Sequence, residues 1–433
     1  MENRLIELLK NRKTGDEMGV YSACTANEVV IKEVLIKAKE TNTTAVIEAT
    51  ANQVDQYGGY TGMKPKDFVN MVHKLAKEVD IELSQVILGG DHLGPLTFIK
   101  YEEAQAMEEA KTLVKEYVLA GFTKIHIDTS MRVASDSTTE PLSTTVIARR
   151  GAELIQVTEQ AYQELLTTNP DAPQLAYIIG SEVPVPGGAT DVEEMQVTTV
   201  DDFINTVNEF KAQLESHGVG HVFNQVVGVV VQPGVEYGDE KVDFYNREAA
   251  KELTAALTQF DPIVFEGHSS DYQSKYHLKQ MVEDGIAILK VGPGLTFAYR
   301  EALFALSYIE QQLFSEEKQS RFIETLEKVM LENPGSWQPY YHGTPEELAT
   351  KRAFSFSDRA RYYLPQPAVD SAIKQLLDNL ESVDLPMNLI SQFLPVQYRK
   401  VNEGRLEKTP TALINDVIGV TLDDYIYAIK KVW

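Results

Sequence analysis

The chain of 433 residues is 43% hydrophobic and 24% charged, which is enough to bury a large core in one big domain or in two ordinary ones. Its 40 Lys and Arg residues against 64 Asp and Glu give a formal net charge of −24. This charge would repel a phosphate backbone, so nucleic acid is excluded as an expected partner. An anionic substrate would need a local source of positive charge in its binding site, such as a metal ion or Lys and Arg side chains.

The single cysteine, Cys24, permits no internal disulfide, and nothing indicates an oxidising compartment. Residues 1–13 are charged and lack the apolar core of a signal peptide. No apolar run approaches the roughly 18–20 residues that span a bilayer. We therefore expect a soluble, cytoplasmic protein without membrane contact. The sequence leaves the number of subunits open, with a homo-oligomer among the alternatives.

Short apolar, β-branched runs recur as far as residue 291, and helix-like stretches lie between them, a pattern that is typical of repeated βα units. The predicted strands are 18–23, 45–50, 86–91, 124–130, 175–182, 228–232, 263–268 and 287–291. The predicted crossover helices include 101–120, 145–167, 200–217, 247–259 and 272–284.

Eight such units favour an α/β fold of the closed TIM (β/α)8 barrel type over an open doubly wound sheet. No G-x-G-x-x-G motif follows the first predicted strand, which disfavours a dinucleotide-binding domain. After Arg300 the sequence becomes helix-rich, with aromatic clusters at 337–342 and 359–365 that we interpret as packing or subunit-interface residues. We predict a barrel over residues 1–310 and a helical C-terminal extension, packed on the barrel, over 311–433.

In such a barrel, catalytic groups lie at the C-terminal ends of the strands. Polar residues at the predicted strand ends are Glu48, Asp91, His92, Asp128, Glu182, Gln232, His268, Ser269, Asp271 and Lys290. Any one of them is often a helix cap or a satisfied polar group at the rim. Several carboxylates and imidazoles at one rim are costly to bury unless they are paired or bind a metal. We therefore predict a divalent metal held by His92, Glu182 and His268.

Two imidazoles and one carboxylate suit zinc first, with manganese, cobalt or nickel as alternatives. Asp91 is the predicted general acid/base, provided that the chain turns within the glycine-rich segment 89–95 so that Asp91 and His92 both reach the site. Its alternative role is to cap the next helix. Glu48 or Asp128 is the expected second acid/base. The histidines interpreted as surface or packing residues are His73, His217, His221 and His277.

The segment from Gly292 to Thr296 follows the last predicted strand and opens a helix, an arrangement that binds phosphate through backbone N–H groups. The predicted substrate- and phosphate-binding residues are Gln53, Ser269, Asp271, Lys290, Gly292, Gly294 and Thr296. Segments 52–62 and 184–188 have the composition of active-site loops, although plain turns carry the same residues.

Seven segments resemble, in the same order, those of the tagatose-bisphosphate aldolase accessory subunit family, the Z-type proteins of galactitol and amino-sugar pathways. They are NQVDQYGGYTGM, GGDHLGP, KIHIDTSM, SEVPVPGG, VVVQPGVE, EGHSSDYQ and LKVGPGLTFAYREALFAL. That family is similar in fold to the metal-dependent class II ketose-bisphosphate aldolases. The resemblance implies that Asp91 matches their acid/base, while His92 and His268 match two metal ligands. Glu182 departs from their pattern, because it stands where the aldolases carry a histidine.

The resemblance implies two functions. Members of the family are described as partners that support a separate aldolase catalytic subunit, and as metal-dependent epimerases that interconvert fructose and tagatose, or their 6-phosphates, at C4. We expect an epimerase acting by retro-aldol cleavage and re-addition, because a purely supporting partner needs no metal ring, acid/base or phosphate loop. The accessory subunit is the alternative. A class II aldolase in its own right is a third hypothesis, disfavoured by Glu182.

Overall fold

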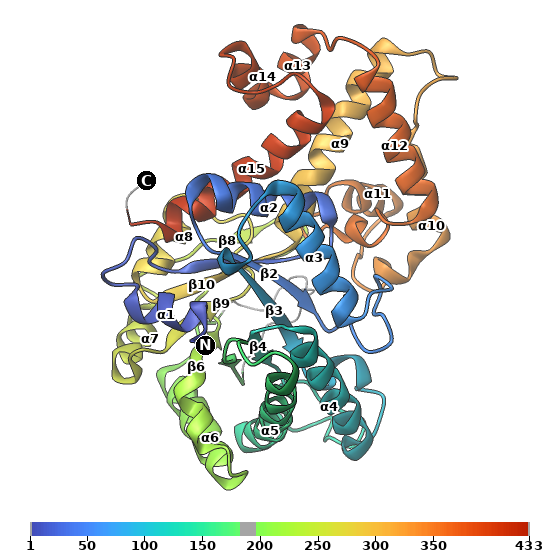
Figure 1. Ribbon diagram of the computed structural model, residues 1–433. Helices are drawn as coiled ribbons and strands as arrows, with labels where there is room; N and C mark the ends of the chain where they lie inside the picture. The colour runs from blue at the N-terminus through green and yellow to red at the C-terminus, as the bar shows by residue number, and fades with distance from the viewer. Residues whose placement is uncertain (1, 182–195, 432–433) are drawn as a thin grey trace. The chain divides into compact units, whose positions relative to one another are not determined.

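In the computed structural model, which describes residues 2–181 and 196–431, eight parallel strands close into a barrel (Figure 1). Around the barrel the strand order is β1 (Val20–Cys24), β10 (Ile286–Val291), β9 (Val264–Gly267), β6 (Val226–Val231), β5 (Ala176–Ile179), β4 (Lys124–Ile127), β3 (Val86–Leu93) and β2 (Ala45–Thr50). A short two-stranded sheet pairs β7 (Glu236–Tyr237) with β8 (Val242–Asp243). The predicted barrel is confirmed, and each predicted strand run overlaps one of its strands.

The helices that precede or connect these strands are α1 (Arg4–Asn11), α2 (Glu28–Thr41), α3 (Pro65–Val79), α4 (Glu103–Ala120), α5 (Thr144–Thr168), α6 (Val200–Ser216), α7 (Lys251–Ala256) and α8 (Lys275–Glu283). Local chemistry sets their ends. Asn27 caps α2 by accepting hydrogen bonds from the N–H groups of Val29 and Val30, and Asn42 ends it in the left-handed conformation. None of the described helices is both long enough and apolar enough to cross a bilayer.

The described residues form two compact units. The first contains the described residues up to 236, residues 242–291 and residues 424–431. The second contains residues 237–241 and 292–423, and the predicted helical extension is confirmed there. Its helices are α9 (Pro293–Leu313), α10 (Phe322–Glu332), α11 (Pro345–Phe354), α12 (Pro367–Glu381), α13 (Met387–Phe393), α14 (Pro395–Asn402) and most of α15 (Pro410–Ile429). Helix α9 runs across residue 310, and the end of α15 from Asp424 belongs to the barrel unit.

The N-terminal end of the barrel interior is apolar and is closed by α1. Leu5, Ile6 and Leu9 of this helix share one core cluster with strand residues. The strand residues of that cluster include Val20, Val46, Ile87, Ala176, Ile178, Val264 and Ala287. Asn3 fixes the helix in place, because its amide donates hydrogen bonds to the carbonyl oxygens of Thr123 (3.0 Å) and Gln174 (2.8 Å), which precede β4 and β5.

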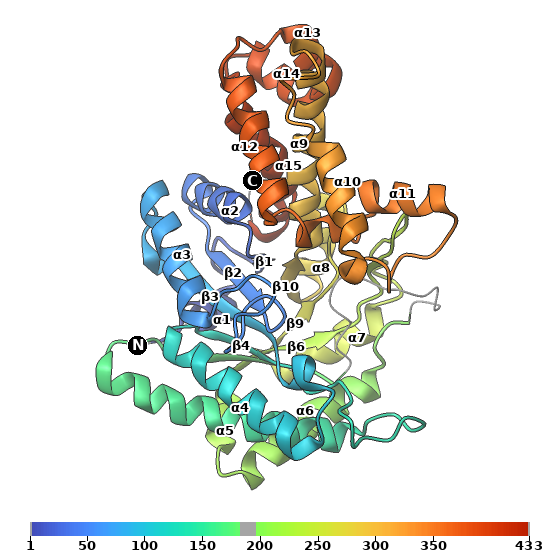
Figure 2. The same ribbon diagram turned by 90° about the vertical axis from the view of Figure 1, so that its right-hand side faces the viewer.

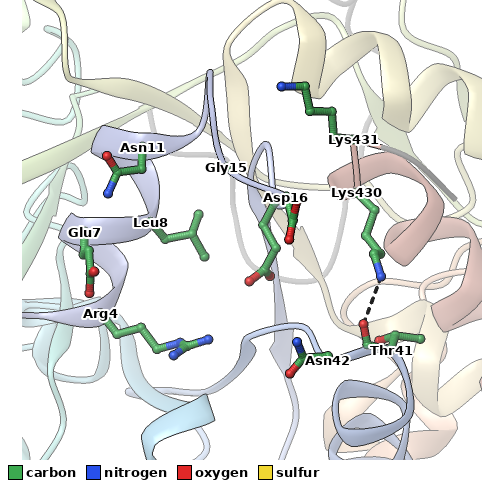
Figure 3. Close-up of a pocket in the computed structure, with 11 residues that line it drawn as sticks. Arg4, Glu7, Leu8, Asn11, Gly15, Asp16, Thr41, Asn42, Lys430 and Lys431 are labelled. Atoms are coloured by element: carbon green, nitrogen blue, oxygen red, sulfur yellow. Dashed lines mark hydrogen bonds between the residues drawn. The ribbon is translucent and has the colours of Figure 1, made fainter.

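Beside α1 lies a cavity of about 510 Å³ whose lining mixes acidic and basic groups (Figure 3). Its charged lining residues are Arg4, Glu7, Asp16, Glu17, Lys430 and Lys431. Lys430 Nζ donates a 2.9 Å hydrogen bond to the carbonyl oxygen of Thr41 at the end of α2. The cavity is lined by none of the predicted site residues.

Candidate metal centre

The C-terminal end of the barrel interior is lined by charged side chains, because alternate residues of a strand share one face. Successive side chains of a strand point to opposite faces, so residues two apart share a face. Lys124, His126 and Asp128 follow this spacing along β4 and the residue just after it, and Glu266 and His268 follow it at the end of β9. All five side chains are buried, and they meet Glu48 from β2, Asp91 and His92 from β3, and Lys290 from β10.

A bulge at the end of β3 turns two consecutive side chains into this cluster. The pairing of β3 with β4 shifts register between Gly90 and Leu93, and His92 has a φ of 50°. Gly94 follows, and a Cβ there would lie 1.8 Å from the carbonyl oxygen of Asp128, so the close approach of the two chains requires glycine. This is the turn that the predicted role of Asp91 requires.

Each of three buried histidines is paired with a carboxylate. The paired atoms are His92 Nδ1 and Asp128 Oδ2 at 2.7 Å, His126 Nδ1 and Asp91 Oδ1 at 2.7 Å, and His268 Nε2 and Glu266 Oε1 at 2.9 Å. The three rings lie close together: their centroids are 5.2 Å apart for His92 and His126, 5.1 Å for His92 and His268, and 5.3 Å for His126 and His268. A carboxylate on one nitrogen orients an imidazole and favours its other nitrogen as a metal ligand.

Two buried lysines hold the carboxylates apart. Lys124 Nζ lies 2.6 Å from Glu48 Oε1 and 2.7 Å from Glu266 Oε2. Lys290 Nζ lies 2.6 Å from Asp91 Oδ2 and also pairs with Glu48 Oε2. Apart from its histidines, the cluster has four carboxylates and two ammonium groups, an excess of two negative charges. Burial would lower the pKa of His92, but Asp91 and Asp128 raise it. A divalent cation would offset the excess negative charge.

The pKa values of these groups follow from burial and from their neighbours. Burial alone would raise the pKa of Asp128, but the hydrogen bond from His92 and the charges of His92 and His126 lower it to about 2. Burial lowers the pKa of His268 to about 4, despite its bond to Glu266. Burial would lower the pKa of Lys290, yet Asp91 and Glu48 hold it well above its usual value. At neutral pH His268 is therefore neutral, which is the form that binds metals.

The residues present fit a divalent metal. Asp91, His126, Glu266 and His268 each offer one ligand atom, and these atoms lie within 4.8 Å of one another. His126 Nε2 is buried and has no hydrogen-bond partner among residues 2–181 and 196–431. Of the three predicted ligands, His92 and His268 lie in the cluster, whereas Glu182 lies outside the described residues.

The structure brings the predicted acid/base residues Asp91, Glu48 and Asp128 together with Lys290. The side-chain oxygen of Gln53 accepts a 2.8 Å hydrogen bond from Thr50 N and so fastens the loop after β2. Ser269 is half-buried with a φ of 54°, and Asp271 is buried.

The predicted phosphate loop falls in the second unit. Gly292, Gly294 and Thr296 open α9, and the Thr296 hydroxyl donates a 2.7 Å hydrogen bond to Asp358 Oδ2. The Thr296 hydroxyl is therefore already hydrogen-bonded to a carboxylate of the same unit.

Four residues of the cluster were not predicted: Cys24, Lys124, His126 and Glu266. Cys24 Sγ lies 3.5 Å from Asp91 Oδ2 in the cluster, and burial raises the pKa of its thiol well above the usual value. The other three lie within strands, two or four residues before a strand-end polar residue. The sequence feature that could have identified these three residues is the alternation of polar positions, K-x-H-x-D in residues 124–128 and E-x-H in residues 266–268.

Comparisons with known proteins agree over almost the whole chain. The model of the family described as D-tagatose-1,6-bisphosphate aldolase subunit GatZ/KbaZ-like matches residues 5–430. Proteins of Salmonella newport and Salmonella typhimurium, both named D-tagatose-1,6-bisphosphate aldolase subunit GatZ, are each 43% identical over 420 residues, which is 97% of this chain and 97% of theirs. A crystal structure from Sinorhizobium meliloti, described as a probable tagatose 6 phosphate kinase, is 41% identical with a TM-score of 0.86, covering 95% of this chain and 100% of that one.

Proposed function

Because the chain belongs to the D-tagatose-1,6-bisphosphate aldolase subunit GatZ/KbaZ-like family, we propose that it is a subunit that supports a separate tagatose-bisphosphate aldolase catalytic subunit. The observation that carries this proposal is the 43% identity to proteins named as that subunit, over 97% of both chains. The match includes both the barrel and the helical extension, so the whole architecture is shared with those relatives.

A second function is favoured by the charged cluster: metal-dependent epimerisation of a ketose, preferably a ketose 6-phosphate, at C4. The cluster buries four carboxylates, three imidazoles and two lysines at the end of the barrel where such folds carry active sites. A buried polar network of this kind is costly unless every member is satisfied, and a purely supporting subunit gains nothing from it. Its presence supports chemistry at this end of the barrel.

In this second function the metal ligands are those predicted from sequence, His92, Glu182 and His268. A bound divalent ion would supply Lewis-acid polarisation of the ketose oxygens. Asp128 holds the His92 ring by the 2.7 Å bond to Nδ1. Burial would raise the Asp91 pKa, but the positive charges of His92 and Lys290 outweigh burial, lower this pKa well below its usual value and keep Asp91 ionised.

Asp91 is the proposed acid/base. It takes the proton of the C4 hydroxyl as the C3–C4 bond breaks, which gives an aldehyde and a three-carbon enediolate. After the aldehyde rotates, C3 attacks its other face, the C3–C4 bond re-forms, and Asp91 returns the proton to the C4 oxygen. Glu48 or Asp128 is the proposed second acid/base. The binding of substrate and phosphate by Gln53, Ser269, Asp271, Gly292, Gly294 and Thr296 is a proposal from the sequence.

One pair of assays separates the two functions. The purified chain alone is incubated with fructose 6-phosphate, with and without a chelator, and tagatose 6-phosphate is followed by chromatography. In parallel, an aldolase catalytic subunit from this type of pathway is assayed for cleavage of tagatose 1,6-bisphosphate with and without the chain.

Stimulated cleavage without any epimerisation supports the subunit alone. Metal-dependent epimerisation that is lost in His268→Ala and retained in His221→Ala, a change of an exposed histidine, supports the enzyme. If neither activity depends on the chain, both proposals fail.

A further inference from the structure

We propose that a second cavity in the barrel unit binds a small amphipathic anion, a molecule with an apolar body and one carboxylate. The cavity is formed by helix α3 and by the segments that lead from α4 into β4 and from α5 into β5. Its volume of about 410 Å³ lies within the range of about 300–1,000 Å³ that is typical of ligand pockets. None of the residues of the charged cluster lines it, so the inference goes beyond both proposed functions.

Most of the cavity lining is apolar. The apolar lining residues are Val69, Leu119, Ala120, Phe122, Leu165, Ala172, Pro173 and Leu175. Thr123, Thr168 and Asn169 add uncharged polar groups. Ligand pockets combine a mainly apolar lining with a few polar groups that fix the orientation of the ligand. This lining therefore suits the apolar body of the proposed ligand.

The inner wall of the cavity is fixed by contacts within the barrel unit. The carbonyl oxygen of Thr123 accepts hydrogen bonds from Ala176 N at 2.8 Å and from Asn3 Nδ2 at 3.0 Å. The fully buried ring of Phe122 stacks on that of Phe68, with centroids 5.8 Å apart. A preformed wall reduces the ordering cost of binding a ligand.

The charged groups of the lining have one sign. Lys66 and His73 line the cavity from α3, and within residues 2–181 and 196–431 no Asp or Glu lines it. Asp67, which follows Lys66, accepts a 3.0 Å hydrogen bond from Lys64 N and is not a lining residue. The cavity beside α1, in contrast, mixes acidic and basic groups. In a chain with a formal charge of −24, a lining with only basic charged groups selects for an anion.

Lys66 and His73 are placed to hold one carboxylate. They lie two helical turns apart on α3, and neither forms an ion pair with a carboxylate of the described residues. Lys66 is in the first turn, where its charge adds to the positive end of the helix dipole. Burial lowers the pKa of His73, and the charge of Lys66 lowers it further. At neutral pH the pair therefore offers one positive charge and one neutral N–H donor, which suits a single negative charge.

Calorimetric titration of the full chain with matched probes tests both parts of the ligand. Octanoate has the body and the charge, 1-octanol has the body alone, acetate has the charge alone, and octylammonium has the opposite charge. We expect octanoate to bind most tightly, and acetate and octylammonium not to bind. Each buried methylene tightens binding about fourfold, so hexanoate should bind about 15-fold more weakly than octanoate. Absence of octanoate binding, or equal binding of octylammonium, would overturn the proposal.

Two neighbouring threonines at the end of α5 provide a variant that blocks the cavity and its control. Both are exposed and both donate a hydrogen bond to the carbonyl oxygen three residues earlier, but Thr168 lines the cavity and Thr167 does not. Thr168→Trp should weaken octanoate binding by more than about 10-fold, because an indole displaces the apolar body from a cavity of this size. Thr167→Trp should bind octanoate like the parent protein.

The charge is tested on α3. Lys66→Met should weaken octanoate binding by up to about fivefold, the range for an exposed ion pair, and should leave 1-octanol binding unchanged. Lys77→Met, at an exposed lysine of α3 that does not line the cavity, should change neither. Unchanged octanoate binding in both Thr168→Trp and Lys66→Met would place the ligand elsewhere and refute the site.

Nuclear magnetic resonance of the parent protein locates the ligand and does not depend on any variant binding. The ring C–H signal of His73, identified by its loss in His73→Gln, should shift as octanoate is added, whereas that of the exposed His342 should not. A stationary His73 signal under saturating octanoate would contradict the site. Because no measurement uses a sugar, a metal or a second subunit, failure of the site would leave both proposed functions untouched, and their failure would leave the site intact.

Discussion

The two ends of the barrel interior are built from the same eight strands and have opposite chemistry. Figure 2 shows the barrel strands with helices α4, α5 and α6 outside them. At the N-terminal end, aliphatic side chains of the strands pack against Leu5, Ile6 and Leu9 of α1. At the C-terminal end, the same strands present carboxylates, imidazoles and lysines, paired atom by atom. Hydrophobic burial is non-directional and tolerates adjustment, whereas a buried charge depends on particular partners.

The comparison shows how this barrel separates stability from chemistry. The apolar end stabilises the fold whatever is bound, because it requires only that α1 remain in place. Within residues 2–181 and 196–431, the charged end has four carboxylates against two ammonium groups, and His126 Nε2 has no hydrogen-bond partner. These are costs in the metal-free fold that a bound cation would offset. Changes at the two ends should therefore differ in size, in dependence on metal and in dependence on pH.

The largest effect is expected from Lys124→Met at the charged end. Removing this buried ammonium group leaves Glu48 and Glu266 without their shared partner, and breaking a buried ion pair from one side costs about 3–5 kcal/mol. Urea denaturation of the purified variant measures the loss. Lys66→Met, at an exposed lysine on α3, is the matched control and should change the free energy of unfolding little. Equal losses in the two variants would contradict the prediction.

At the apolar end, Ile6→Ala should lower the free energy of unfolding by about 2–4 kcal/mol, because it leaves a cavity between α1 and the strands. Leu8→Ala, on the half-buried face of the same helix, should cost less. The same urea titration compares the two. A loss in Leu8→Ala as large as that in Ile6→Ala would mean that α1 does not close the barrel as described.

Removal of the metal tests whether the two ends of the barrel contribute independently to stability. A ligand that binds only the folded protein at 100 times its Kd stabilises it by about 2.7 kcal/mol. Adding zinc to metal-free protein should therefore raise the Tm in calorimetry, and a chelator should reverse the rise. Ile6→Ala should retain the full increment, because the apolar core cluster of the described residues includes no residue of the charged cluster, and the effects of distant changes add. Loss of the increment in Ile6→Ala would show that the two ends are coupled.

The smallest effect concerns pH. Burial raises the pKa of Glu17 near α1, although hydrogen bonds from the Thr44 N–H and hydroxyl partly offset this. The folded protein thus holds this proton more tightly than the unfolded chain does. The resulting stabilisation is full below the ordinary glutamate pKa and is lost as pH rises through the folded value. Stability measured from pH 4 upward should fall less steeply in Glu17→Gln, and parallel curves would refute the assignment.

The sequence by itself determined the fold and the strand ends of the site. The repeat of βα units predicted the barrel, and strand-end polarity placed Asp91, His92, Asp128, His268 and Lys290 where the structure brings them together. The reason is that hydrophobic period and chain direction are local properties. In a parallel barrel they also decide which end each residue occupies.

The tertiary structure alone decided which side chains meet. Alternation along β4 indicates that Lys124 and His126 share a face, but only closure of the barrel shows that this face is interior and that Lys124 reaches both Glu48 and Glu266. Likewise, the bulge that turns His92 beside Asp91 depends on the register of β3 against β4. Register and closure are set by contacts between residues far apart in the chain, and so no single segment encodes them.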